Sequence, residues 1–213
     1  MEFLTLNNGI KCPVVGIGTF MLSPEQAENS VKEALKMGYS LVDTANAYVN
    51  ERAVGRGMKE SGVKREEIFL STKLWPSEYE NENAVQETLE RLGVDYVDLL
   101  YIHQPAGNWL AGYRQLEKAY KEGKAKSIGI SNFEGKYIEE LQTKWEVIPQ
   151  FIQAEAHPYF TPMPSLSCWT VMTHWLARTC SSMYGTATLF PMQMLQLGAS
   201  TRHIGCSLII DTL

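Results

Sequence analysis

The chain has 213 residues, a formal net charge of -5, 45% hydrophobic residues and 20% charged residues. This length fits one domain or a small pair of domains, and the composition excludes an intrinsically disordered chain. The scattered basic residues exclude the clustered basic face of a nucleic-acid-binding protein, and no apolar run is long enough to predict a membrane-spanning helix. The first residues do not resemble a secretory signal, and the four cysteines form no CxxC pair. We therefore expect a cytoplasmic protein whose partner is a small molecule.

The predicted elements begin with a β-hairpin. Residues 3–6 and 10–14 flank Asn8-Gly9, a dipeptide typical of two-residue hairpin turns. Short β-branched or aliphatic runs then recur about every 27 residues, at 14–19, 40–45, 68–73, 97–103, 126–132 and 151–157. These runs are apolar at both odd and even positions, which predicts parallel strands buried on both faces.

Amphipathic segments between these runs predict helices. Ser23-Pro24-Glu25-Gln26 has the features of a capping box with proline at the first helical position, and the helix that follows should end at Gly38. A second apolar stripe begins at Ala84 and stops at Gly93, and a third, around Leu116, stops before Gly123. The chain therefore alternates strands and helices, as in a doubly wound sheet or a closed barrel with right-handed crossovers.

Polar residues at the ends of the predicted strands favour the barrel. They are Asp43, Lys73, His103, Ser131, Asn132 and Gln153. In a barrel of parallel strands all carboxyl ends open onto one face, where catalytic groups gather. A doubly wound dinucleotide-binding sheet would instead need a Gly-rich first loop, and Gly16-Ile17-Gly18 lacks the third glycine. We predict an α/β fold of the TIM (β/α)8 type with an N-terminal β-hairpin, of which about six βα units are recognisable.

Four of the polar residues suit the reduction of a carbonyl group. Asp43 and Lys73 on neighbouring strands can form an ion pair, and the Lys73 ammonium should lower the pKa of Tyr48 so that this phenol acts as a proton donor. His103 can present an imidazole N–H to the same oxygen. Each residue alone also has an ordinary structural explanation, but four such groups at three consecutive strand ends are harder to explain by packing.

Two other enzyme classes remain open on the same residues. Lys73 can serve as the Schiff-base lysine of an aldolase-like barrel, or Asp43, His103 and His157 can bind a metal as in barrel hydrolases. Neither alternative uses Tyr48, and no strand carries an HxH pair. We expect no metal site.

Several motifs of the chain closely resemble those of the aldo-keto reductase family. They are Asp43-Thr44-Ala45 with Tyr48, and residues 71–75 (STKLW), 98–103 (DLLYIH), 128–133 (IGISNF) and 153–159 (QAEAHPY). The resemblance covers residues 1–161 and is greatest for the branch that includes 2,5-diketo-gluconate reductases, glyoxal reductases and prostaglandin F synthases.

The resemblance implies a (β/α)8 barrel that binds NADPH across its top. It implies a catalytic tetrad of Asp43, Tyr48, Lys73 and His103, in which Tyr48 protonates the carbonyl oxygen. It implies contacts to the cofactor from Gly18, Thr19, Asp43, Ser131, Asn132 and Gln153. Phe20, Trp75 and Trp109 would line the substrate pocket, and Phe20 stands where many relatives carry Trp.

The composition changes abruptly after residue 161. Residues 162–213 contain only three charged residues, Arg178, Arg202 and Asp211, and no Lys or Glu. No segment there resembles the sixth helix, strand seven or strand eight of the family. We expect 1–161 to be a partial barrel and 162–213 to be a non-matching tail produced by a frameshift or an erroneous gene end, which resequencing would test.

Two further interpretations of this tail remain open, and the first is a genuine but divergent C-terminus. Its cysteines and histidines can be interpreted as zinc ligands, although their spacing fits no known finger pattern; they are Cys168, His174, Cys180, His203 and Cys206. We predict an NADPH-dependent reductase of aldehydes or ketones; the alternative is a catalytically inactive truncated relative or a binding module. The pattern does not predict the oligomeric state.

Overall fold

A computed structural model describes residues 2–155, 175–179, 189–191 and 193–196 of the chain. Its centre is a curved sheet of six parallel strands that follow one another in chain order. The strands are β3 (Val15–Gly18), β4 (Leu41–Asp43), β5 (Phe69–Leu74), β6 (Leu99–Ile102), β7 (Ile128–Ser131) and β8 (Phe151–Glu155). Each of the six predicted runs forms one of these strands, so the prediction of an incomplete parallel barrel is confirmed.

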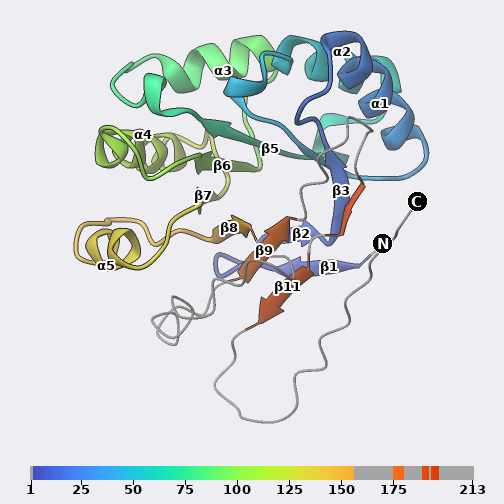
Figure 1. Cartoon of the computed structure of the whole chain (residues 1–213). Helices are drawn as coiled ribbons and strands as arrows, with labels where there is room; N and C mark the ends of the chain where they lie inside the picture. The colour runs from blue at the N-terminus through green and yellow to red at the C-terminus, as the bar shows by residue number, and fades with distance from the viewer. Residues whose placement is uncertain (1, 156–174, 180–188, 192, 197–213) are drawn as a thin grey trace.

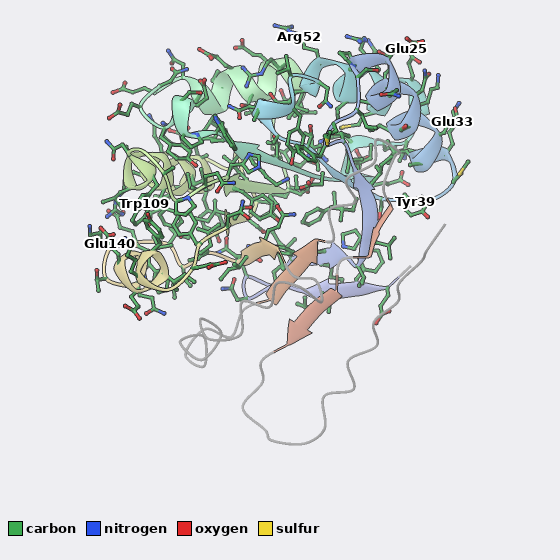
Figure 2. All side chains as sticks on the ribbon, viewed as in Figure 1. Glu25, Glu33, Tyr39, Arg52, Trp109 and Glu140 are labelled. Carbon is green, nitrogen blue, oxygen red and sulfur yellow. The ribbon has the colours of Figure 1, made fainter. Side chains whose placement is uncertain are left out.

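Five helices lie along the outer side of this sheet (Figure 1). They are α1 (Pro24–Lys36), α2 (Glu51–Ser61), α3 (Ala84–Leu92), α4 (Trp109–Lys121) and α5 (Lys136–Gln142). Helix α1 begins with the predicted capping box, in which Ser23 and Gln26 bond each other's backbone N–H groups. Glu25 and Arg52 lie on the outer faces of α1 and α2 (Figure 2), as expected for helices that bury one apolar stripe. Three short 3₁₀ helices, η1 (Asn46–Tyr48), η2 (Arg65–Glu67) and η3 (Pro76–Glu78), complete the connections.

Helix α2, like α5, is not singled out by the sequence pattern. It contains Gly55 and Gly57, and glycine is a poor helix former. Both glycines are explained by close packing against neighbouring backbone. A Cβ atom at Gly55 would lie 2.2 Å from the carbonyl oxygen of Leu92, and one at Gly57 would lie 2.5 Å from that of Glu28. Close packing between the helices therefore requires glycine at these two positions, despite its low helix propensity.

The N-terminal hairpin closes the amino ends of the strands. Strands β1 (Phe3–Thr5) and β2 (Lys11–Pro13) pair antiparallel, which confirms the predicted hairpin. The Leu6 N–H donates to the Ile10 carbonyl oxygen, so the connection consists of residues 7–9 rather than of two residues, and Gly9 ends it with a φ of +84°. The Asn8 amide donates to the Lys126 carbonyl at 3.0 Å and to Ser127 Oγ at 3.1 Å, just before β7. Behind this turn lies an apolar cluster inside the curved sheet, made of Leu6, Cys12, Leu41, Phe69, Leu99, Tyr101 and Phe151.

Three short strands from the range 162–213, in which no segment resembles strands seven and eight of the family, extend the sheet. Strand β9 (Trp175–Thr179) runs parallel to β8, and β11 (Gln193–Gln196) runs antiparallel to β9. Strand β10 (Leu189–Pro191) pairs antiparallel with β3 at the other edge. These strands pair the open backbone groups that an edge strand would otherwise present. The proposed zinc ligands and His157 lie outside the described residues.

Candidate active site

An ion pair joins the carboxyl ends of β4 and β5. The Lys73 Nζ atom lies 2.5 Å from Asp43 Oδ2 and donates to the Thr44 carbonyl oxygen at 3.1 Å. Ser71 Oγ donates to the other oxygen of the same carboxylate at 2.6 Å. Lys73 is 1% exposed, and the pKa of its ammonium is raised because Asp43 and Tyr48 stabilise the charged form more than burial destabilises it. Lys73 is therefore a buried, paired cation at the strand ends.

Tyr48 lies beside this cation at the end of η1. The Lys73 Nζ atom is 5.5 Å from the centre of the Tyr48 ring. The prediction that Lys73 lowers the pKa of Tyr48 is wrong in its net direction. Burial raises this pKa above its ordinary value, and Asp43 raises it further, so that together they outweigh the lowering by Lys73. The phenol is consequently protonated near neutral pH, as a proton donor must be.

His103 follows β6 and is buried next to Tyr48. Their ring centres are 5.8 Å apart, and the Trp75 ring packs edge-on against the imidazole at 4.9 Å. Burial is the larger cause and repulsion from Lys73 the smaller cause that together lower the pKa of His103 to about 3. The imidazole is therefore neutral. Its Nδ1 atom has no hydrogen-bond partner among the described residues, which favours the tautomer that carries its hydrogen on Nε2.

The polar residues at the ends of β7 and β8 form a second group beside His103. The Asn132 side-chain amide donates to the His103 carbonyl at 3.0 Å and to Ser131 Oγ at 3.2 Å. Ser131 Oγ donates in turn to Gln153 Oε1 at 3.5 Å. Asn132 has a φ of +61°, in the left-handed region that asparagine tolerates better than most residues. Ser131, Asn132 and Gln153 thus lie together, next to the histidine.

Gly18 and Thr19, the predicted cofactor-contact residues at the end of β3, have different surroundings in the structure. Gly18 pairs with Asp43 across the β3–β4 ladder, which places it beside the ion pair. Thr19 is fully buried, and its hydroxyl donates to Thr44 Oγ1 at 2.9 Å. The Asn50 amide donates to the Thr19 carbonyl at 2.9 Å. The Thr19 side chain therefore links β3 and β4 to the start of α2.

This buried network contains Thr44 and Asn50, to which the sequence pattern assigns no role in the site. Asn50 directly precedes α2 and has the residue type of a helix N-cap. Its side chain makes no capping bond and instead holds the backbone of Thr19 and Leu22. An asparagine at this position indicates a helix cap rather than a contact with the segment after β3, so the sequence pattern does not predict this role of Asn50.

Two of the three predicted pocket aromatics lie at the site. Phe20 is 52% exposed, with its ring 5.1 Å from that of Tyr48, and Trp75 is 40% exposed against His103. The structure does not place Trp109 with them, in contrast to the prediction that it lines the substrate pocket. It is 7% exposed in the first turn of α4 and packs edge-on against Phe133 and Tyr137. Figure 2 labels it at α4, and its ring contact with Tyr137 of α5 places it between these two helices.

The arrangement brings a neutral phenol, a buried ammonium and a neutral imidazole around one point. Such a set can polarise an oxygen atom and give it a proton. Within the described ranges no group of three His, Cys, Asp or Glu side chains is placed to hold a metal ion. No helix of the described part is both long and apolar enough to cross a bilayer.

The chain is similar to known oxidoreductases over most of its length. It is 41% identical over 170 residues to morphine 6-dehydrogenase of Pseudomonas putida and 44% identical over 165 residues to glyoxal reductase of Bacillus subtilis (strain 168). These matches cover 77% and 75% of this chain, but only 57% and 60% of the two relatives. The chain thus spans less than two thirds of the length of these curated relatives.

A solved structure has the same arrangement of elements. The aldo-keto reductase of Bombyx mori in complex with NADP superposes with a TM-score of 0.77 at 30% identity, covering 83% of this chain and 65% of that one. The sequence model of the Aldo/keto reductase family matches residues 14–181, which extends past residue 161. The match includes every strand end that contributes to the site. This chain belongs to the Aldo/keto reductase family.

Proposed function

We propose that this chain carries the active site of an NADPH-dependent carbonyl reductase that acts on small aldehydes, α-keto carbonyls or sugar-derived ketones. The observation that carries the proposal is the convergence of Tyr48 and His103 on the buried Lys73–Asp43 pair. The similarity to a glyoxal reductase supports the substrate class, and the NADP complex of the Bombyx mori relative supports the cofactor.

In this proposal Tyr48 is the general acid. Its raised pKa keeps the phenol protonated while a carbonyl group binds. As the carbonyl oxygen gains negative charge, the phenol hydrogen passes to that oxygen and leaves a tyrosinate next to the Lys73 ammonium. Asp43 keeps Lys73 charged and in place through their direct contact. The same cation therefore stabilises Tyr48 after the proton has left.

His103 orients the carbonyl oxygen. With its hydrogen on Nε2, the neutral imidazole can donate one hydrogen bond to that oxygen without competing as an acid, because its pKa is about 3. The Asn132 side-chain amide, which donates to the His103 backbone carbonyl, helps to hold the histidine in place. Phe20 and Trp75 form apolar walls beside this point, against which the apolar part of a substrate can pack.

The residues at the ends of β7 and β8 fit the carboxamide of a nicotinamide ring. Within the described part of the chain, no hydrogen bond uses the Asn132 Oδ1 acceptor or the Gln153 Nε2 donor. A carboxamide has one donor group and one acceptor, so it complements this pair, and Ser131 adds a hydroxyl. NADPH bound there would supply the hydride.

The proposal is tested with purified protein, NADPH and methylglyoxal. We expect loss of NADPH absorbance at 340 nm in the wild type, and a decrease of kcat by at least about 10³-fold in Tyr48→Phe with little change in NADPH affinity. Tyr39→Phe is the matched control, because Tyr39 packs on the helix side of the sheet away from the site. A folded wild type that binds NADPH but does not consume it would support the inactive relative or binding module instead.

A cytoplasmic location is part of the same proposal. Cys12, the cysteine within the described part of the chain, is a buried free thiol, which fits a reducing compartment. Fractionation of the native cells would test the location.

A further inference from the structure

A second tyrosine, Tyr101, packs against the buried Lys73 from the neighbouring strand β6. Tyr101 lies on β6 directly across the ladder from Lys73, and the Lys73 Nζ atom is 5.6 Å from the centre of the Tyr101 ring. The Tyr48 ring lies at 5.5 Å from the same atom. The ammonium therefore contacts two aromatic rings within the distance at which a cation is attracted to a ring face.

The Tyr101 ring is held firmly in this position. It is fully buried, and the Phe151 ring packs edge-on against it at 5.7 Å. Gly129 occupies the neighbouring position on β7, where a Cβ atom would lie only 2.7 Å from Tyr101 Cδ1. The absence of a side chain at Gly129 thus makes room for this ring. The ring has little freedom to move away from Lys73.

The hydroxyl of Tyr101 does not explain why a tyrosine stands here. It has no hydrogen-bond partner among the described residues, although it is completely buried. Leaving a buried polar group without a partner destabilises a fold. Burial, Asp43 and Cys12 all raise the pKa of Tyr101, so the phenol carries no charge toward Lys73. What Tyr101 presents to the lysine is the face of its ring.

We propose that Tyr101 is a positioning residue whose ring holds the Lys73 ammonium, in its charged form, against Asp43 and Tyr48. The consequence for catalysis rests on the proposed reductase function, whereas the effect on Lys73 does not. The Asp43 contact holds the ammonium from the β4 side, and the ring closes the space toward the interior of the sheet. The ring also keeps water from replacing the protein contacts of the cation.

The test compares Tyr101→Leu with Tyr101→Phe, which keeps the ring and removes only the hydroxyl. We expect Tyr101→Leu to lower kcat about tenfold with KM nearly unchanged, and Tyr101→Phe to retain wild-type turnover. Tyr101→Met is a second ringless variant in case leucine prevents folding. Phe69→Leu controls for loss of packing, because Phe69 belongs to the same interior cluster and makes no ring contact with Lys73.

A second measurement needs neither substrate nor cofactor. The pKa of Lys73 is followed by NMR of lysines labelled at Nζ, with Lys73→Met to assign the signal. We expect it to fall by about one unit in Tyr101→Leu or Tyr101→Met, and to stay unchanged in Tyr101→Phe and Phe69→Leu. An unchanged or raised pKa in both ringless variants, or an equal fall in Phe69→Leu, would overturn the proposal. If the wild type shows no turnover, the reductase function fails while this measurement still decides the role of Tyr101.

Discussion

The amino and carboxyl ends of the six strands β3–β8 differ in burial, in charge and in backbone conformation. At the amino ends, Leu41, Phe69 and Leu99 are no more than 6% exposed and pack beneath the hairpin. At the carboxyl ends, charged and polar groups lie around a point bordered by Phe20 and Trp75, which are 52% and 40% exposed. Stability and chemistry are thus separated along the strand axis, over a distance of only a few residues per strand.

The backbone differs between the two ends as well. The non-glycine residues with positive φ in the described part are Met21, Val49 and Asn132, and each directly follows a residue of the candidate site. Val49 is β-branched, so its φ of +58° is unfavourable for its side chain. At the hairpin end the corresponding turn uses Gly9, for which positive φ has no such cost. Backbone strain is therefore concentrated where the reactive groups lie.

The largest expected effect is at the carboxyl ends. Lys73→Met should lower kcat by about 10³-fold, because Tyr48 would lose the cation that stabilises its anion. NADPH affinity should change less than about threefold, since the carboxamide group is proposed to contact other residues. Steady-state kinetics and fluorescence titration measure the two quantities. Retention of wild-type kcat would remove Lys73 from the mechanism.

The second prediction concerns a buried carboxylate at the amino ends. Asp98, just before β6, accepts hydrogen bonds from Arg65 at 2.8 Å and Lys126 at 3.1 Å, and from the Leu70 N–H. Asp98→Ala should lower the free energy of unfolding by about 3 kcal/mol, because it leaves these donors without their partner. Urea denaturation measures this change. Asp95→Ala, at an exposed neighbouring position, should cost less than about 0.5 kcal/mol.

Together these two variants test the separation of the two ends. The kcat of the folded Asp98→Ala protein should equal that of the wild type. A specific loss of turnover in this variant would show that the amino ends also contribute to the chemistry.

The third prediction is a pH dependence that arises at His103. The pKa of His103 is about 3 in the folded protein against an ordinary value of 6.5, so between these values the unfolded chain binds a proton that the folded chain does not. The stability contributed by neutral His103 is complete above about pH 6.5 and is lost as the pH falls toward 3. The difference in unfolding free energy between wild type and His103→Gln should therefore shift by about 2 kcal/mol against the wild type from pH 7 to pH 5. Equal pH dependence in both proteins would mean that His103 is not buried as a neutral group.

The smallest effect is expected at the hairpin turn. Asn8→Ala removes two hydrogen bonds to the segment before β7 and should lower the unfolding free energy by about 1 kcal/mol. Turnover and NADPH affinity should be unchanged. Asn7→Ala is not a suitable control because Asn7 has interactions of its own; Lys11→Ala, at an exposed hairpin position, should change stability by less than about 0.5 kcal/mol. A destabilisation above about 3 kcal/mol in Asn8→Ala would mean that the hairpin is needed for the sheet to form.

The amino-acid pattern alone predicts where the strands lie along the chain and which polar residues end them. Runs that are apolar at both odd and even positions predict buried parallel strands, and Asp43, Lys73 and His103 at their ends predict a common site, because parallel strands share one carboxyl face. The hairpin at Asn8-Gly9 and the capping box at Ser23 are predictable as well, because each depends only on residues that are neighbours in the sequence.

The surroundings of these groups follow from packing in three dimensions and not from the local pattern. The direction of the pKa change at Tyr48 depends on burial by distant segments, which outweighs the nearby lysine. Trp109 lies between helices rather than at the site, Thr19 bonds inward to Thr44, and the Tyr101 ring lies beneath Lys73. None of these contacts has a local sequence pattern. They result from packing between elements far apart in the chain, where burial, dielectric environment and ring position are set by all neighbours together.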